Sequence, residues 1–176
     1  FQGDTTARPV NFFHPEALPV KLSKTYLILT RAERYTPAKE MISAMMRYHE
    51  DLDGNFVEQF QTTAFDARLW ELYLFATMVE LNYAREPKIR TPDFVLSGTR
   101  GKLAIEATTI NPSQGFLHKL PDNKAEINDY MDNYVPIRLA RALREKLKKE
   151  YWKQPHMKDK PLVFAVHEWK PPPVRS

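Results

Sequence analysis

The stretch TPDFVLSGTRGKLAIEATTI, residues 91–110, decides the fold of this chain. Its first part, 91–97, has the pattern of a short strand that a proline opens. Gly98 and Gly101 bracket a turn, and side chains in 102–110 then alternate between two faces, as they do along a β-strand. The stretch therefore predicts a β-hairpin.

The predicted hairpin brings two acidic residues together. If its turn is centred between Thr99 and Arg100, Asp93 and Glu106 are equally far from the turn and face each other, with Cβ atoms about 4.5–5.5 Å apart. Like charges at such positions destabilise a sheet unless a positive charge lies between them. A divalent cation would supply that charge, because Mg²⁺ is commonly held by one or two carboxylates with waters and phosphate oxygens. The alternative is a register slipped by one residue, which would send the two acids to opposite faces.

The spacing of apolar residues predicts helices on either side of the hairpin. The segment 25–30 fits either a strand or a buried helix. The other predicted elements are a helix that opens at Thr36-Pro37 and ends near Gly54, a buried helix over 65–83, a helix over 125–153 interrupted at Pro136, and a strand over 161–168. This order predicts an α/β fold in which helices flank a small mixed sheet.

Length and composition limit the class of protein. The chain has 176 residues, the size of one domain, with 43% hydrophobic and 27% charged residues, which excludes a disordered chain. Because no run of about 18 apolar residues occurs, we expect no membrane-spanning helix. The chain has no cysteine. This absence excludes disulfides and thiolate metal sites and favours a reducing, cytoplasmic location.

Four segments are predicted along the chain. Residues 1–3 look like the remnant of a cleavable tag, and residues 4–63 form an N-terminal arm and helical lead-in. The core is expected over 64–168. Residues 169–176 are a proline-rich end, and we expect the native chain to continue past Ser176.

Positive charge is concentrated in one segment. Residues 138–160 contain nine Lys or Arg and three Asp or Glu, a net charge of +6, whereas the whole chain carries +4. Such a segment suits contact with a polyanion such as nucleic acid. The alternative is an ordinary solvated helix face.

A third acidic residue stands in the most apolar predicted helix. Glu71 is the only acid between Leu69 and Met78. Acidic side chains are almost never fully buried without a partner. The plain explanation is an ion pair with Arg68, which lies three residues earlier on the same helical face.

These acids and their order resemble the PD-(D/E)XK nuclease superfamily. The matching residues are Glu71 on a helix, Pro92-Asp93 on a strand and Glu106-Ala107-Thr108 on the next strand. The order α-β-β-β-α-β agrees with that family over about 64–168. The segments FDARLWELYLFA, PDF and AIEATTINP are also similar to those of bacterial proteins described as nucleases of this kind.

The resemblance implies a restriction-endonuclease-like core that binds Mg²⁺ or Mn²⁺. By this resemblance Asp93, Glu106 and the backbone carbonyl of Ala107 would hold the metal, with Glu71 as a further partner. The metal would lower the pKa of a bound water and stabilise negative charge on the phosphate that is cut.

The chain departs from the family pattern at one position. The family's lysine belongs at position 108, where this chain has Thr108, which cannot supply a cation. The family tolerates a replacement lysine on a neighbouring element. On a helical wheel Lys146 lies about 60° from the centre of an apolar stripe of Leu139, Leu143 and Leu147, at the edge of the buried face. Alternatively, Lys146 packs only its stem and extends its ammonium to water.

Further residues are expected around this site. Those expected to contact phosphates are Arg138, Arg141, Lys148 and Lys149, and those expected at the rim are Thr108 and His118. The leading hypothesis is a divalent-metal-dependent nuclease that hydrolyses DNA or RNA. Nucleic acid is then the expected partner, and a homodimer stays open as an oligomeric state.

Two alternatives stay open. One is a nuclease-shaped module that binds nucleic acid or a protein partner without catalysis, which Thr108 favours. It predicts salt-sensitive binding with no metal-dependent turnover. The other treats the three acids as structural, with Glu71 paired to Arg68 and the hairpin register slipped.

Overall fold

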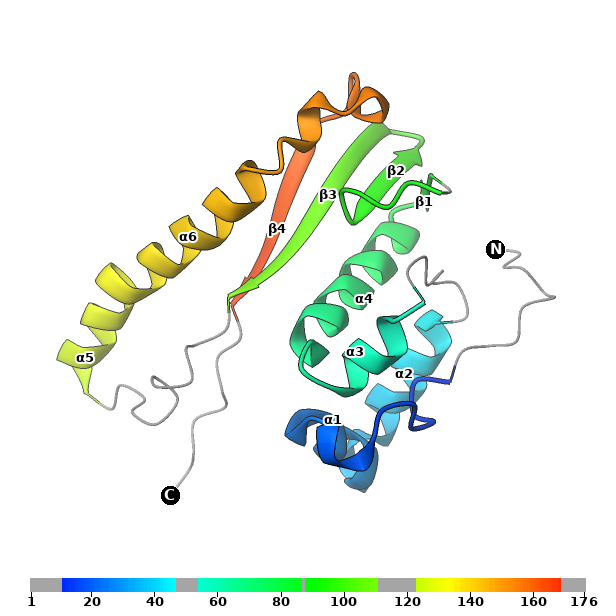
Figure 1. Ribbon diagram of the computed structural model, residues 1–176, viewed down its shortest axis with the longest axis vertical. Coiled ribbons are helices and arrows are strands. Elements are labelled where there is room, and N and C mark those ends of the chain that lie inside the picture. Colours follow the sequence, from blue (N-terminus) through cyan, green and yellow to red (C-terminus); the bar gives the residue numbers. More distant parts are fainter. Residues whose placement is uncertain (1–10, 47–53, 87, 111–122, 169–176) are drawn as a thin grey trace. The chain divides into compact units, whose positions relative to one another are not determined.

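The computed structural model describes residues 11–46, 54–86, 88–110 and 123–168 (Figure 1). The chain is mixed α/β, as predicted, and forms two compact units, Phe1–Arg90 and Thr91–Ser176. The boundary between the units falls inside 64–168, the range that the sequence grouped as one core. In the described part of the chain, no helix has both the length and the apolar character needed to cross a bilayer. The tag remnant and the proline-rich end lie outside the described residues.

The first unit consists of helices and one short strand. Its elements are a 3₁₀ turn Pro19–Lys21, α1 (Lys24–Arg31), a 3₁₀ turn Glu33–Tyr35, α2 (Thr36–Met46), α3 (Phe56–Gln61), α4 (Phe65–Glu80) and β1 (Tyr83–Arg85). The segment 25–30, which the sequence left open, lies in α1. The Ser23 side chain accepts a hydrogen bond from the backbone N of Tyr26 (3.1 Å) and so caps the start of this helix.

An aromatic core and one buried amide hold the N-terminal arm of this unit. The rings of Phe12 and Phe60 stack with centroids 4.7 Å apart. The Gln61 side chain is fully buried, and its amide donates to the carbonyls of Phe12 (2.9 Å) and His14 (2.7 Å). Its oxygen accepts from the backbone N of Glu16 (2.9 Å) and of Ala17 (3.1 Å). This one side chain therefore holds four backbone groups of the arm, and the Tyr26 hydroxyl also donates to the Phe12 carbonyl (3.3 Å).

The second unit contains three strands and a helical segment. Its elements are β2 (Phe94–Gly98), β3 (Gly101–Ile110), α5 (Lys124–Asp129), a π-helical turn Tyr130–Tyr134, α6 (Val135–Leu147), 3₁₀ turns Tyr151–Lys153 and Pro155–Met157, and β4 (Leu162–Glu168). The order α4, β1, β2, β3, α6, β4 is the α-β-β-β-α-β order that the resemblance implies. The residues themselves predicted the hairpin and the last strand but not β1, whose Tyr83 was expected to end a helix.

The three strands of this unit form a mixed arrangement with β3 in the middle. β2 pairs antiparallel with β3, from Phe94 opposite Ile105 to Gly98 opposite Gly101. This is the predicted hairpin register, so the slipped register is wrong. β4 runs parallel to β3 and places Phe164 opposite Glu106. Figure 1 shows the helical segment running alongside β4 and β3.

The predicted helix over 125–153 is divided into several pieces. Pro136 is the second residue of α6, and a proline has no N–H to give to the preceding turn. That turn widens into the π-helix Tyr130–Tyr134. Beyond α6, Glu150 adopts a left-handed conformation (φ 47°), which ends the helical direction before Tyr151.

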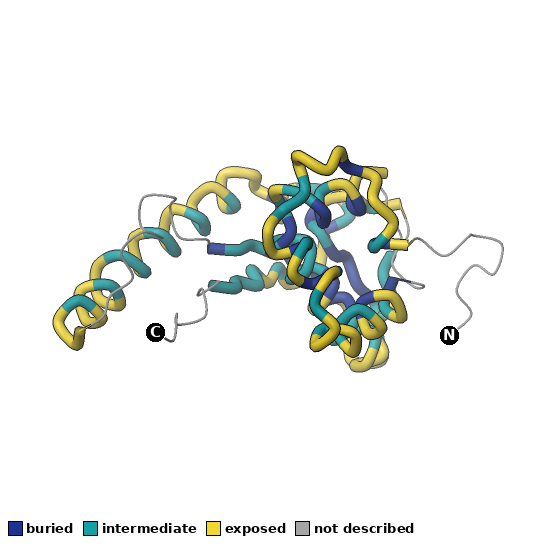
Figure 2. The backbone as a smooth tube through the Cα atoms, turned by 90° about the horizontal axis from the view of Figure 1, so that it is seen from below, coloured by how far each residue is buried: buried dark blue, intermediate teal, exposed yellow. Residues whose placement is uncertain are grey.

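The inward face of α6 differs in part from the predicted apolar stripe. Leu139 and Leu143 are half-buried, but Leu147 is exposed and Lys146 takes the inward position. Arg138, which the sequence predicts to contact phosphates, is half-buried with its guanidinium 5.9 Å from the centre of the Tyr134 ring. Buried residues lie along β2 and β3, whereas β4 and α6 have none (Figure 2).

Candidate active site

The hairpin register brings Asp93 and Glu106 together. Asp93 immediately precedes β2, and the next residue, Phe94, pairs with Ile105. The Asp93 backbone N donates to Glu106 Oε2 (3.2 Å), and the Ala107 backbone N donates to Asp93 Oδ2 (2.8 Å). The Glu106 carboxylate thus accepts the N–H of Asp93, just before β2, and the Asp93 carboxylate accepts the N–H of Ala107 on β3. This reciprocal bonding fixes both side chains at the end of the β2–β3 ladder.

The second oxygen of the Glu106 carboxylate is held from the helical side. Glu106 is only 2% exposed. Its Oε1 accepts from Lys146 Nζ (2.6 Å) and from the Tyr151 hydroxyl (2.8 Å), and Lys149 Nζ lies 3.7 Å away. A buried carboxylate without such partners would be strongly destabilising. The predicted inward position of Lys146 is therefore confirmed, and its ammonium binds a buried acid as well as meeting solvent.

The charges at this position are balanced by the chain itself. Two carboxylates, Asp93 and Glu106, lie with two ammonium groups, Lys146 and Lys149. The sequence invoked a divalent cation to relieve repulsion between the two acids. In the structure lysines supply positive charge beside Glu106, so the two acids can be held together before any metal binds.

Tyr151 belongs to this site, although it is not among the site residues predicted from the sequence. It is 3% exposed. Burial, and then the hydrogen bond to the Glu106 carboxylate, raise the pKa of the Tyr151 phenol above its ordinary value. The phenol therefore remains a donor to Glu106 at neutral pH. No sequence pattern could place it here, because its position follows from the left-handed Glu150 just before it.

The backbone of Ala107 completes a group of oxygen atoms. In a strand the N–H and C=O of one residue point to the same neighbouring strand. Since the Ala107 N–H reaches Asp93, its carbonyl also points to that side. Ala104 confirms the alternation, because its N–H points the other way and donates to the Pro161 carbonyl that precedes β4 (2.9 Å).

The oxygens of Asp93, Glu106 and Ala107 suit a hard divalent ion. Mg²⁺ is usually held by one or two carboxylates, with waters and substrate phosphates as the other ligands. Within the described residues, no group of three or more His, Cys, Asp and Glu side chains could hold a metal. The two carboxylates at this point are thus too few for a closed structural metal site.

Glu71 has a local ion-pair partner on α4 in the first unit. Arg68 Nη1 donates to Glu71 Oε2 at 2.6 Å, three residues apart on the helix. The same guanidinium donates through Nε to Gln59 (2.8 Å) and lies over the Phe56 ring. The predicted Arg68 pair is confirmed, and it accounts for an acid in this apolar helix.

The remaining predicted residues lie in different parts of the structure. Thr108 is half-buried on β3, on the same face as Glu106, because residues two apart in a strand share a face. Lys149 reaches Glu106, whereas Arg141 and Lys148 line a separate groove on α6. His118 lies outside the described residues.

Comparisons with known proteins assign the chain to no family. No protein-family model matches it, and searches of curated proteins and of solved structures gave no significant match. A functional proposal therefore depends on the geometry of Asp93, Glu106 and their partners, together with the resemblance of the motif that carries them.

Proposed function

We propose that this chain is a cytoplasmic, divalent-metal-dependent nuclease that hydrolyses phosphodiester bonds of DNA or RNA. One observation carries the proposal. Asp93 and Glu106 are held side by side by reciprocal hydrogen bonds, and a lysine contacts the more buried acid. Paired acids with a nearby cation are what a metal-assisted phosphodiesterase needs.

Mg²⁺ or Mn²⁺ would be held by Asp93, by Glu106 through Oε2, and by the Ala107 carbonyl. When bound, the ion would polarise the phosphate and lower the pKa of a water molecule. Tyr151 and Lys146 both bind Glu106 Oε1. They orient the carboxylate so that Oε2 is the oxygen on the Asp93 side.

Lys146 and Lys149 have different roles in this proposal. Lys146 binds Glu106 at 2.6 Å, so it fixes the acid and contributes a nearby positive charge. Lys149 is 54% exposed and 3.7 Å from the same oxygen, so its ammonium can turn toward a phosphate in solution. A preorganised cation beside a developing negative charge lowers the barrier to its formation. Together they would replace the lysine that position 108 lacks.

Cleavage by matched variants tests the proposal. Asp93→Asn keeps an oxygen that can accept from the Ala107 N–H, and it removes the charge that a metal needs. Glu106→Gln also removes that charge, but it keeps only one of the two accepting oxygens, because the other becomes an amide NH₂ that can only donate. We expect both variants to lose cleavage of duplex DNA, single-stranded DNA or RNA in Mn²⁺ or Mg²⁺ while remaining folded. Asp132→Asn, an exposed acid in the π-helical turn, is the control and should cleave like the wild type. Retained cleavage by purified Asp93→Asn would eliminate this site.

A second candidate function is a nuclease-shaped module that binds nucleic acid or a protein without catalysis. Thr108 in place of the family lysine favours it, as does the engagement of both Glu106 oxygens. This alternative predicts salt-dependent binding of nucleic acid and no cleavage with either metal. The wild type and the same three variants therefore distinguish the two functions.

A further inference from the structure

The side of α6 that faces away from Glu106 carries its own cluster of positive charge. Taking Lys146 as the inward direction, a rotation of 100° per residue places Arg141, Arg144 and Lys148 about 140–160° away around the helix axis. Lys146 contacts Glu106, so these three side chains lie on the opposite side of the helix. We call this side the outer face of α6.

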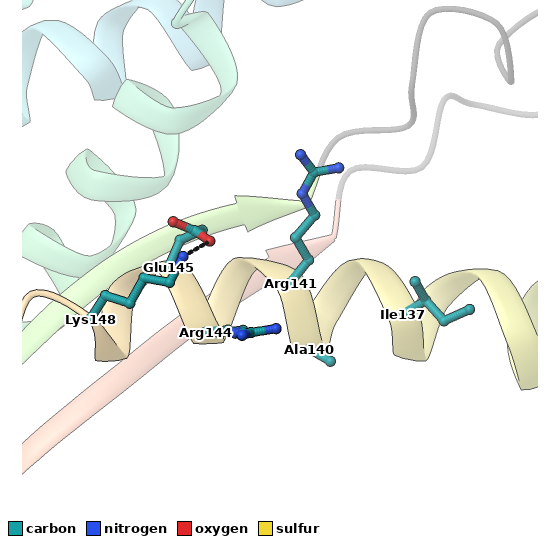
Figure 3. Close-up of a pocket in the computed structure, with 6 residues that line it drawn as sticks. All are labelled: Ile137, Ala140, Arg141, Arg144, Glu145 and Lys148. Carbon is teal, nitrogen blue, oxygen red and sulfur yellow. Dashed lines mark hydrogen bonds and ion pairs between the residues drawn. The ribbon is translucent and has the colours of Figure 1, made fainter.

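An open groove of about 510 Å³ lies between the side chains on the outer face of α6. Figure 3 shows the side chains that line it, which come from α6 and its C-cap residue Lys148: Ile137, Ala140, Arg141, Arg144, Glu145 and Lys148. Three positive charges face one negative charge. Glu145 pairs with Lys148 at 2.6 Å, and the charges of Arg144 and Arg141 also act on Glu145. The groove therefore keeps a net positive charge after its internal ion pair has formed.

We propose that the outer face of α6 is a second nucleic-acid-binding surface, separate from the Asp93–Glu106 site. It would hold the phosphate backbone of a strand without reading its sequence. The choice of nucleic acid as partner rests on the proposed function, but the binding itself needs neither the metal nor the two acids.

The composition of the groove favours nucleic acid over an acidic protein. Guanidinium groups match the phosphate geometry with two parallel hydrogen bonds, and two of the three cations are arginines. Arg141 and Lys148 are about 10 Å apart along the helix axis, which suits a line of phosphates. A protein partner would need a buried aromatic or aliphatic anchor. The groove offers only the exposed Ile137 and the small Ala140.

Salt-dependent binding tests the inference. Binding of a fluorescent oligothymidine strand would be measured by anisotropy over a range of salt, in EDTA so that no metal-dependent cleavage occurs. The test variant replaces Arg141, Arg144 and Lys148 with Gln, which keeps good helix formers on an exposed face. Because each phosphate contact on a single strand contributes about 0.7 to the salt slope, the slope should fall by about 2.

A control variant removes the same charge elsewhere. Lys21, Lys24 and Arg31 are exposed in the first unit, and their replacement by Gln should leave the slope unchanged. Equal loss in the two triple variants would overturn the inference, because net charge alone would then explain binding. So would competition by polyglutamate as strong as that by unlabelled oligothymidine at equal charge, since that result would indicate an acidic protein partner.

The outcomes separate this inference from the proposed nuclease. If no substrate is cut but the outer-face variant alone loses binding, the nuclease fails and the second surface stands. If cleavage requires Asp93 but the outer-face variant binds like the wild type, the second surface fails and the nuclease stands. Binding by Asp93→Asn should equal that of the wild type under either outcome for cleavage.

Discussion

Replacing Tyr151 with Phe removes one hydroxyl group from the most buried part of the candidate site. That hydroxyl donates to Glu106 Oε1 at 2.8 Å, and neither residue is more than 3% exposed. A hydrogen bond to a charged group contributes about 1.5–3 kcal/mol to stability. Lys146 still binds the same oxygen at 2.6 Å, so we expect a loss near the lower end, about 2 kcal/mol.

Thermal and urea unfolding measure this loss. For a chain of this length about 2 kcal/mol corresponds to a fall in Tm of about 4–8 °C. Tyr73→Phe is the matched control, because Tyr73 is exposed on α4 and its change should stay within about 0.5 kcal/mol. A Tyr151→Phe variant as stable as the control would refute the described hydrogen bond to Glu106.

A double-mutant cycle assigns the effect to the pair. Combining Tyr151→Phe with Glu106→Gln should give a coupling free energy of about 1 kcal/mol or more, because the two side chains are in direct contact. Additive effects of the two substitutions would mean that Tyr151 stabilises the unit only by packing. The orienting part given to Tyr151 would then be wrong.

Two further predictions follow from buried polar groups. Burial and a hydrogen bond to Glu168 raise the pKa of Tyr130 to about 12, and the pKa of Tyr151 is also raised, so both phenols stay neutral in the folded chain after unfolded tyrosines ionise. The stability that these phenols contribute is complete below about pH 10 and is lost as pH rises through the folded pKa values. Urea unfolding over an alkaline pH series should show this loss of stability, and the loss should be smaller in Tyr130→Phe. Ultraviolet absorbance that showed all tyrosines titrating together would contradict the prediction. Gln61→Leu removes a partner from four backbone groups of the arm, of which the Phe12 carbonyl still accepts from the Tyr26 hydroxyl at 3.3 Å. We expect a loss of about 2–4 kcal/mol and faster hydrogen exchange over 12–17, whereas unchanged exchange would show that Gln61 does not hold the arm.

The main features of the site could be predicted because they follow from local spacing. Two glycines around a turn set the hairpin register, and that register alone places Asp93 opposite Glu106. Helical periodicity found Lys146 as the inward lysine. The spacing of three residues between Arg68 and Glu71 likewise predicted their ion pair.

Other features depend on backbone geometry that no periodic pattern reveals. Tyr151 reaches Glu106 only because Glu150, which is not a glycine, adopts a positive φ. The predicted stripe through Leu147 ends on an exposed residue, because residues four apart drift by about 40° around a helix. Gln61 gave no signal either, since its four partners lie more than forty residues earlier in the chain.

The central claim is that Asp93 and Glu106 form a site for a divalent ion. Mn²⁺ binding by calorimetry tests it without any choice of substrate, on the wild-type chain, on Asp93→Asn and on the control Asp132→Asn. We predict millimolar or tighter binding by the wild type and the control, and its loss in Asp93→Asn. A folded wild-type chain that binds no Mn²⁺, or an Asp93→Asn variant that binds it equally well, would contradict the account.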